Sequence, residues 1–203
     1  LFVLCVMGGR VIPMFTNNAI PAARAVRKPR VERFALGLIL ALILADSLHV
    51  SGLSLALLAL CAMVAHLTRL WFWQPWTTLN TPLVWVLHAA YAWIPLHLGF
   101  RAMAAMSWIS PSVANHSLTT GAIGGMVIGM MTRTALGHTG RKLAAGWAEV
   151  TCYSLVAAAA LVRVFVPLLF PAFILQSVII SAVMWSTGFG LYALRYWPIL
   201  SRD

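Results

Sequence analysis

Six long apolar runs constrain this sequence more than any other feature. They lie near residues 34–50, 52–68, 82–106, 116–137, 146–168 and 172–194, and residues 1–15 resemble the end of another run. A hydrocarbon core about 30 Å thick needs about 20 mostly apolar residues per helix. Backbone polar groups in lipid must be paired within a helix or a closed barrel, and these runs are too long for barrel strands. The pattern predicts an all-α, polytopic helical membrane protein with about six complete transmembrane helices plus the end of another.

The composition excludes a soluble globular domain, because 62% of the residues are hydrophobic and only 9% are charged. Residues 1–203 are therefore predicted to form a single transmembrane helical bundle. The chain begins at Leu1 without a charged segment ahead of its apolar residues, which does not fit a signal peptide. We expect the bundle to be part of a longer protein. Three isolated cysteines and no CxxCH motif exclude covalent c-type haem attachment.

Basic residues predict the orientation of the bundle, because short cytoplasmic loops hold an excess of Lys and Arg. The first loop is the most basic and contains Arg24, Arg27, Lys28, Arg30 and Arg33. Alternate connections also carry basic residues, which are Arg69, Arg141, Lys142, Arg195 and Arg202. The first loop and the C-terminus are thus predicted to be cytoplasmic. Orientation and anionic lipid headgroups account for the net charge of +10, and nucleic acid is not an expected partner.

Ionisable side chains within the runs are the candidate functional residues, because such groups are costly in lipid. An outer layer contains Asp46, His49, His97, Arg101, His116 and Arg163. An inner layer contains Arg10, His66, His88, Arg133, His138 and Glu149. Several of these groups have simpler roles open to them. His49 and His66 near helix ends are expected to be satisfied by water, and Arg101 and Arg133 can extend to the interface.

The segment HSLTTGAIGGMVIGMMTRTALGHTGR at residues 116–141 has two distinct faces if it is helical. Gly121, Gly125 and Gly129 fall on one face, where two GxxxG steps predict the close approach of another helix. His116 and His138 fall on the opposite face, at about 100° of rotation per residue. We expect the histidine face to line a cofactor site or a channel.

Metal chemistry fits the histidines and arginines of the two layers. His88 lies roughly six residues inside its run, about 9 Å from the edge, where an imidazole needs a partner or a metal. Imidazoles suit iron and copper, so His88, His116 and His138 are candidate metal ligands. Arginines suit the propionates of a haem, which makes Arg10 and Arg133 candidates for that role.

Three segments, LFVLCVMGGRVIPMFTNNAIP, WVLHAAYAWIPL and HSLTTGAIGGMVIGMMTRTALGHTGRK, resemble the NnrS family. These are bacterial inner-membrane proteins associated with haem, copper and the response to nitric oxide. The resemblance covers most of the chain and matches the C-terminal half of such proteins. It implies haem and copper as cofactors, nitric oxide or a related small molecule as ligand, and the N-terminal half as partner.

Transferred residue by residue, the resemblance points to the same histidines as metal ligands, His88, His116 and His138. It implies a cofactor-binding set of Arg10, Asn17, Asn18, Arg133 and Arg141. His97 stands where the family pattern has a small residue, so it is outside this set.

Two alternatives to a haem protein stay open from the sequence. A transporter could use the same buried histidines and arginines as a proton or anion path without a metal. A structural membrane subunit could use them only to pair its helices. A visible Soret band distinguishes the haem protein from both, and pH-dependent flux distinguishes the transporter.

Overall fold

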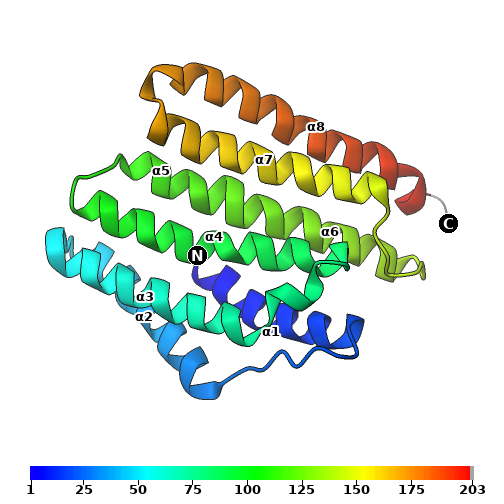
Figure 1. Ribbon diagram of the computed structural model, residues 1–203, viewed down its shortest axis with the longest axis horizontal. Helices are drawn as coiled ribbons and strands as arrows, with labels where there is room; N and C mark the ends of the chain where they lie inside the picture. The colour runs from blue at the N-terminus through cyan, green and yellow to red at the C-terminus, as the bar shows by residue number, and fades with distance from the viewer. Residues whose placement is uncertain (202–203) are drawn as a thin grey trace.

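The computed structural model describes residues 1–201, and all regular secondary structure in this range is helical, which confirms the predicted all-α class. The helices are α1 (Phe2–Ala19), α2 (Pro29–Ser47), α3 (Gly52–Phe72), α4 (Pro82–Ala105), α5 (Pro111–His116), α6 (Gly124–His138), α7 (Trp147–Leu169) and α8 (Ile174–Leu200). Short helical turns η1 (Pro75–Thr78), η2 (Ser117–Ile123) and η3 (Pro171–Phe173) connect or extend them. The long helices run side by side, with the α7–α8 hairpin at one edge and α2 and α3 at the other (Figure 1).

Among residues 1–201, four helical segments are long and apolar enough to cross a membrane, namely Gly52–Phe72, Pro82–Ala105, Trp147–Leu169 and Pro171–Leu200. These helices indicate that the chain is a membrane protein. Helix α2 is more charged than these, because it contains Arg30, Glu32, Arg33 and Asp46. The run at 116–137 is divided between α5, η2 and α6. The finer count of six complete spans plus the end of another stays a prediction.

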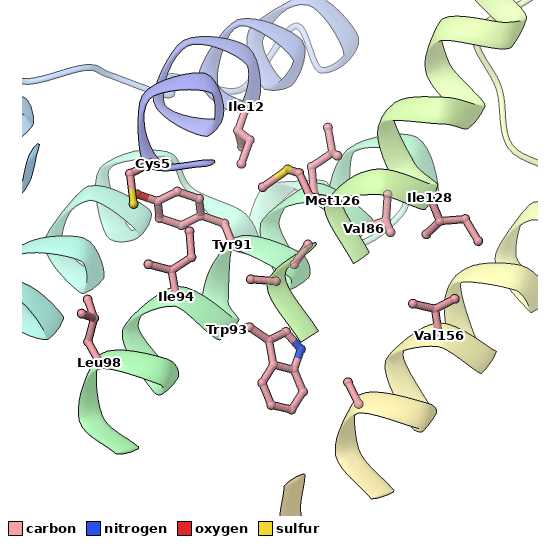
Figure 2. Close-up of a cluster of buried hydrophobic side chains, with 14 of the residues drawn as sticks. Cys5, Ile12, Val86, Tyr91, Trp93, Ile94, Leu98, Met126, Ile128 and Val156 are labelled. Carbon is pink, nitrogen blue, oxygen red and sulfur yellow. The ribbon is translucent and has the colours of Figure 1, made fainter. Parts of the chain in front are cut away.

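Helix α4 lies at the centre of the bundle and carries most of the core. Of its most apolar window, 72% is buried, against 17% for the segment Pro171–Leu200 at the edge. Its side chains pack against α1, α3, α6 and α7 (Figure 2). Tyr91, Trp93, Ile94 and Leu98 are among the buried residues that α4 contributes to this cluster. Most side chains near the middle of α4 are therefore buried, whereas Ala89 and Leu96 on one face are exposed.

The glycine face of the segment 116–141 lies directly against α4. A Cβ atom added to Gly125 would lie 2.9 Å from the Ala90 Cβ, and one added to Gly129 would lie 2.8 Å from Leu87 Cδ2. At Gly121 an added Cβ would collide with the Trp93 ring. Gly121 lies within η2, a π-helical segment, which is a rare conformation that widens the turn. The absence of these three side chains lets the two helices approach closely.

We expect Gly125→Leu to destabilise the protein by about 1–3 kcal/mol, because Leu would force α4 and α6 apart at a packed contact. Ile123→Leu is the matched control, since Ile123 is 37% exposed and the change preserves side-chain volume. The measurement is the unfolding midpoint of both purified variants in the same detergent. Equal midpoints would contradict a tight crossing at Gly125.

Candidate functional site

His88 is a buried histidine of α4 with one free ring nitrogen. Its Nε2 lies 2.9 Å from the Thr16 hydroxyl of α1, and that hydroxyl donates to the Ile12 carbonyl at 2.8 Å. Because the Thr16 hydrogen is used, its oxygen accepts from His88, which places the ring proton on Nε2. Nδ1 is then a lone-pair nitrogen, and it has no hydrogen-bond partner although it is buried. Such an atom is costly unless a ligand satisfies it.

A pocket of about 550 Å³ adjoins His88 between the end of α3, η1 and α4. Its lining is mostly apolar and includes Leu70, Trp76, Leu79, Trp85, Ala89 and Ala92. The connection from α3 to α4 forms part of the pocket lining. Gln74 adopts a left-handed backbone conformation (φ 54°), which turns the chain into η1, and Trp76 packs on Trp71 with ring centroids 4.7 Å apart. His88, with its unpartnered Nδ1, thus lines an apolar, aromatic pocket.

The other two predicted metal ligands lie elsewhere. His116, at the end of α5, accepts a hydrogen bond at Nε2 from Nη2 of Arg163, 2.6 Å away on α7. His138 ends α6 and is exposed. Within residues 1–201, no three side chains of His, Cys, Asp or Glu come together as a metal-binding group. The three histidines therefore do not form one cluster.

None of the three predicted cofactor-binding arginines pairs with an acid within residues 1–201. The ion pairs among the described residues use Arg27, Arg69, Arg101 and Arg195, and neither Arg10 nor Arg133 takes part. Arg10 is exposed on α1 beside a pocket of about 750 Å³. Arg133 stacks over the Phe15 ring, 3.5 Å from its centroid. Both guanidinium groups are available to an anion.

The remaining predicted cofactor-binding residues differ in their environments. Asn17 donates to the Ala25 carbonyl and accepts from the Ala25 amide, both at 2.9 Å. Its amide group thus fixes the loop after α1, and it has little capacity left for a cofactor. Asn18 is exposed at the end of α1, and Arg141 is exposed in the connection after α6.

A buried polar cluster formed by Glu32, His66, Arg69 and Tyr91 was not predicted as a unit. Arg69 donates to both carboxylate oxygens of Glu32, at 2.8 and 3.0 Å. It also donates to the Tyr91 hydroxyl at 2.6 Å and to the Cys5 carbonyl at 3.1 Å. The cluster therefore joins α1, α2, α3 and α4. The expectations that Arg69 lies in a connection and that water satisfies His66 are wrong, because both are in α3 and at most 1% exposed.

The cluster also fixes a proton on His66. Tyr91 accepts from Arg69, so its own hydroxyl donates to His66 Nδ1 at 2.7 Å. The ring proton is then on Nε2, which is buried without a hydrogen-bond partner.

A side chain at Gly9 would collide with the Arg69 guanidinium, so glycine is needed there. The sequence signal for this cluster was an acid and an arginine near the ends of adjacent apolar runs.

The C-terminal end of α4 carries a second group of polar residues. Arg101 of α4 pairs with Asp46 of α2. His97 donates from Nδ1 to the Ala114 carbonyl at 2.7 Å, and the residue is 5% exposed. These contacts join α4 to α2 and α5.

Comparison with protein families assigns the chain to a family, which the geometry alone does not do. The sequence matches the NnrS family, described as NnrS protein, over residues 1–203. The chain belongs to the NnrS family. No curated protein and no solved structure matches it. In this NnrS-family chain, the shared family sequence includes both the segment around His88 and the glycine-rich segment that packs against α4.

Proposed function

We propose that this NnrS-type membrane protein binds haem, with copper as a second metal, and acts in the response or tolerance to nitric oxide. The observation that carries the proposal is the buried, unpartnered Nδ1 of His88 beside an apolar pocket. Iron and copper are the metals that imidazole suits in redox proteins. The hydrogen bond between His88 Nε2 and the Thr16 hydroxyl would fix the orientation of the ring, as hydrogen bonds to metal-ligating histidines commonly do.

The pocket beside His88 suits haem better than copper, because the two metals need different numbers of protein ligands. A haem iron would need as few as one protein histidine, because the porphyrin itself supplies most of the ligands to the iron. A copper ion needs several protein ligands, and no group of three His, Cys, Asp or Glu side chains that could hold a metal occurs within residues 1–201. The aromatic wall formed by Trp76 and Trp85 suits a flat apolar ring. Haem would supply the redox chemistry and the site for nitric oxide.

The unpaired arginines suit the anionic part of a haem. Each propionate carries a negative charge, and a guanidinium binds a carboxylate through two parallel hydrogen bonds. Arg10 and Arg133 have no competing acid among the described residues, so both remain candidates for this role. His116 and His138 are proposed as additional metal ligands. For His116, ligation through Nε2 requires that Arg163 release this nitrogen.

The unpartnered nitrogen of His88 makes the two metals separable by experiment. Nδ1 is bonded to Cγ and lies closer to the backbone than Nε2, so it is the more crowded ring nitrogen. Nε2 is hydrogen-bonded to Thr16, so ligation of a haem through Nε2 would require the ring to move away from Thr16. Haem and copper should therefore be quantified together in the same samples.

The absorbance spectrum of the purified full-length protein tests the proposed function. We expect a Soret band that shifts when nitric oxide is added, because the ligand binds at haem iron. A protein without a Soret band that carries pH-dependent flux in vesicles would instead be a transporter. A protein with neither property would be a structural subunit.

We propose that the protein lies in the bacterial inner membrane with the α1–α2 loop and the C-terminus in the cytoplasm. The expected result is that a cysteine at Ser112 reacts with an impermeant thiol reagent in intact cells, and a cysteine at Ser201 does not. Both serines are exposed, so accessibility in the protein itself does not limit the reaction. The background needs Cys61→Ser, because Cys61 is the exposed native cysteine. Equal labelling at both positions would contradict this orientation.

A further inference from the structure

An apolar groove lies on the outer surface between α2 and α3. Its volume is about 540 Å³, and its walls include Val31 and Phe34 of α2 and Leu60, Cys61 and Val64 of α3. Phe34 is 61% exposed and Val64 is 56% exposed, so the groove faces away from the bundle. Helix α2 extends away from α3 towards its N-terminal end (Figure 1). In a membrane protein such a surface contacts lipid acyl chains.

The groove has a positively charged end. Arg30, in the first turn of α2, lines it together with Thr68 near the end of α3. Arg27, Lys28 and Arg33 are close by in sequence. Arg30 is exposed and belongs to none of the ion pairs found in residues 1–201. The end of the groove therefore offers a guanidinium at the level predicted for the cytoplasmic interface.

The acid nearest to Arg30 in sequence does not pair with it. Glu32 is buried, both of its oxygens accept hydrogen bonds from Arg69, and Oε2 also lies 3.8 Å from Nη2 of Arg27. Arg30 therefore has no acidic partner within residues 1–201 and is available to an anion from outside the chain. Arginine binds phosphate oxygens through directional, charge-assisted hydrogen bonds, which favours a phosphate over a simple counterion.

We infer that this groove binds an anionic phospholipid, with one acyl chain between α2 and α3 and the headgroup phosphate on Arg30. The apolar and basic parts are arranged as such a lipid requires. From Leu60 to Thr68 the groove follows α3 for about 12 Å, at 1.5 Å per residue, and it ends at the arginine. A groove contacts a chain on several sides, so it holds the chain more tightly than a convex helix surface does. Charge complementarity selects a negatively charged headgroup.

Native mass spectrometry of the full-length protein in non-ionic detergent tests this inference. Phosphatidylglycerol and phosphatidylcholine with identical acyl chains are added separately, and their bound fractions are compared. We expect tighter binding of phosphatidylglycerol, and about fivefold weaker binding of it in Arg30→Gln, as for the loss of one basic residue near an anionic headgroup. Arg24→Gln is the charge-matched control, because Arg24 is exposed and contacts the Pro21 and Ala23 carbonyls outside the groove.

A second pair of variants tests the apolar part of the groove. Cys61→Phe fills it and should weaken binding of both lipids, whereas Leu57→Phe, one turn away on the exposed surface of α3, should not. The inference is overturned if the wild-type protein binds both lipids equally. It is also overturned if Arg24→Gln weakens phosphatidylglycerol as much as Arg30→Gln does, or if Cys61→Phe has no effect. None of these outcomes depends on the metal content of the protein.

Discussion

Arg69→Ala should destabilise the protein by about 3–5 kcal/mol, as expected when one partner of a buried ion pair is removed. The substitution leaves the Glu32 carboxylate buried, with only Arg27 nearby at 3.8 Å. It also removes the hydrogen bonds to the Tyr91 hydroxyl and the Cys5 carbonyl. Contacts from α3 to three other helices are lost together. The measurement is the unfolding midpoint in detergent, compared with the wild-type protein.

Two further variants show whether the pairing is responsible. Arg33→Ala is the control, because Arg33 is exposed and donates only to the Pro29 carbonyl of its own helix, and it should change stability by less than about 0.5 kcal/mol. The double variant Arg69→Met with Glu32→Leu leaves no unpaired charge, so it should be more stable than Arg69→Ala. A double variant as unstable as the single one would show that packing, and not the buried charge, sets the loss.

His88→Ala should remove the bound metal cofactor almost completely. Loss of the hydrogen bond that a neighbouring residue makes to a metal-ligating side chain already lowers metal affinity about 10–100-fold. Loss of the ligating side chain itself should lower the affinity by more. His88 is the buried histidine with a lone-pair nitrogen on an apolar pocket, and alanine offers no replacement. The measurement is haem and copper per folded protein, with the folded fraction taken from size-exclusion chromatography.

His49→Ala is the control for this variant. His49 is exposed in the turn after α2, with a left-handed backbone (φ 55°), and it is expected to keep the full cofactor content. His116→Ala and His138→Ala are expected to lower the content as well. If His88→Ala keeps its cofactors while His49→Ala loses them, His88 is not the ligand. Loss of copper alone would assign His88 to copper through Nδ1.

Much of the architecture could be predicted from the sequence because helix periodicity is a local property. The length of the apolar runs indicated membrane helices, and α3, α4 and α7 correspond closely to three of them. The spacing of Gly121, Gly125 and Gly129 by four residues marks one helix face without reference to other helices. Depth along a run likewise singled out His88, since position within a helix follows from counting residues.

The buried contacts depended on which helices are neighbours, and spacing within one helix does not specify that. Thr16 and His88 are 72 positions apart, and Glu32 and Arg69 are 37 apart. Arg69 was therefore assigned to a connection by its charge, although an acid from α2 pairs with it inside the bundle. The π-helical segment at Ser117–Ile123 also escaped prediction, because it changes the turn without changing the apolar pattern.

The absorbance spectrum of His88→Gly, recorded with and without added imidazole, tests the central claim most directly. Glycine removes the ligand and leaves space beside the pocket that free imidazole can enter. We predict that the purified variant lacks the Soret band of the wild-type protein and that haem with imidazole restores it, whereas haem alone does not. A wild-type protein without this band, or a variant whose band is unchanged before imidazole is added, would contradict haem ligation by His88.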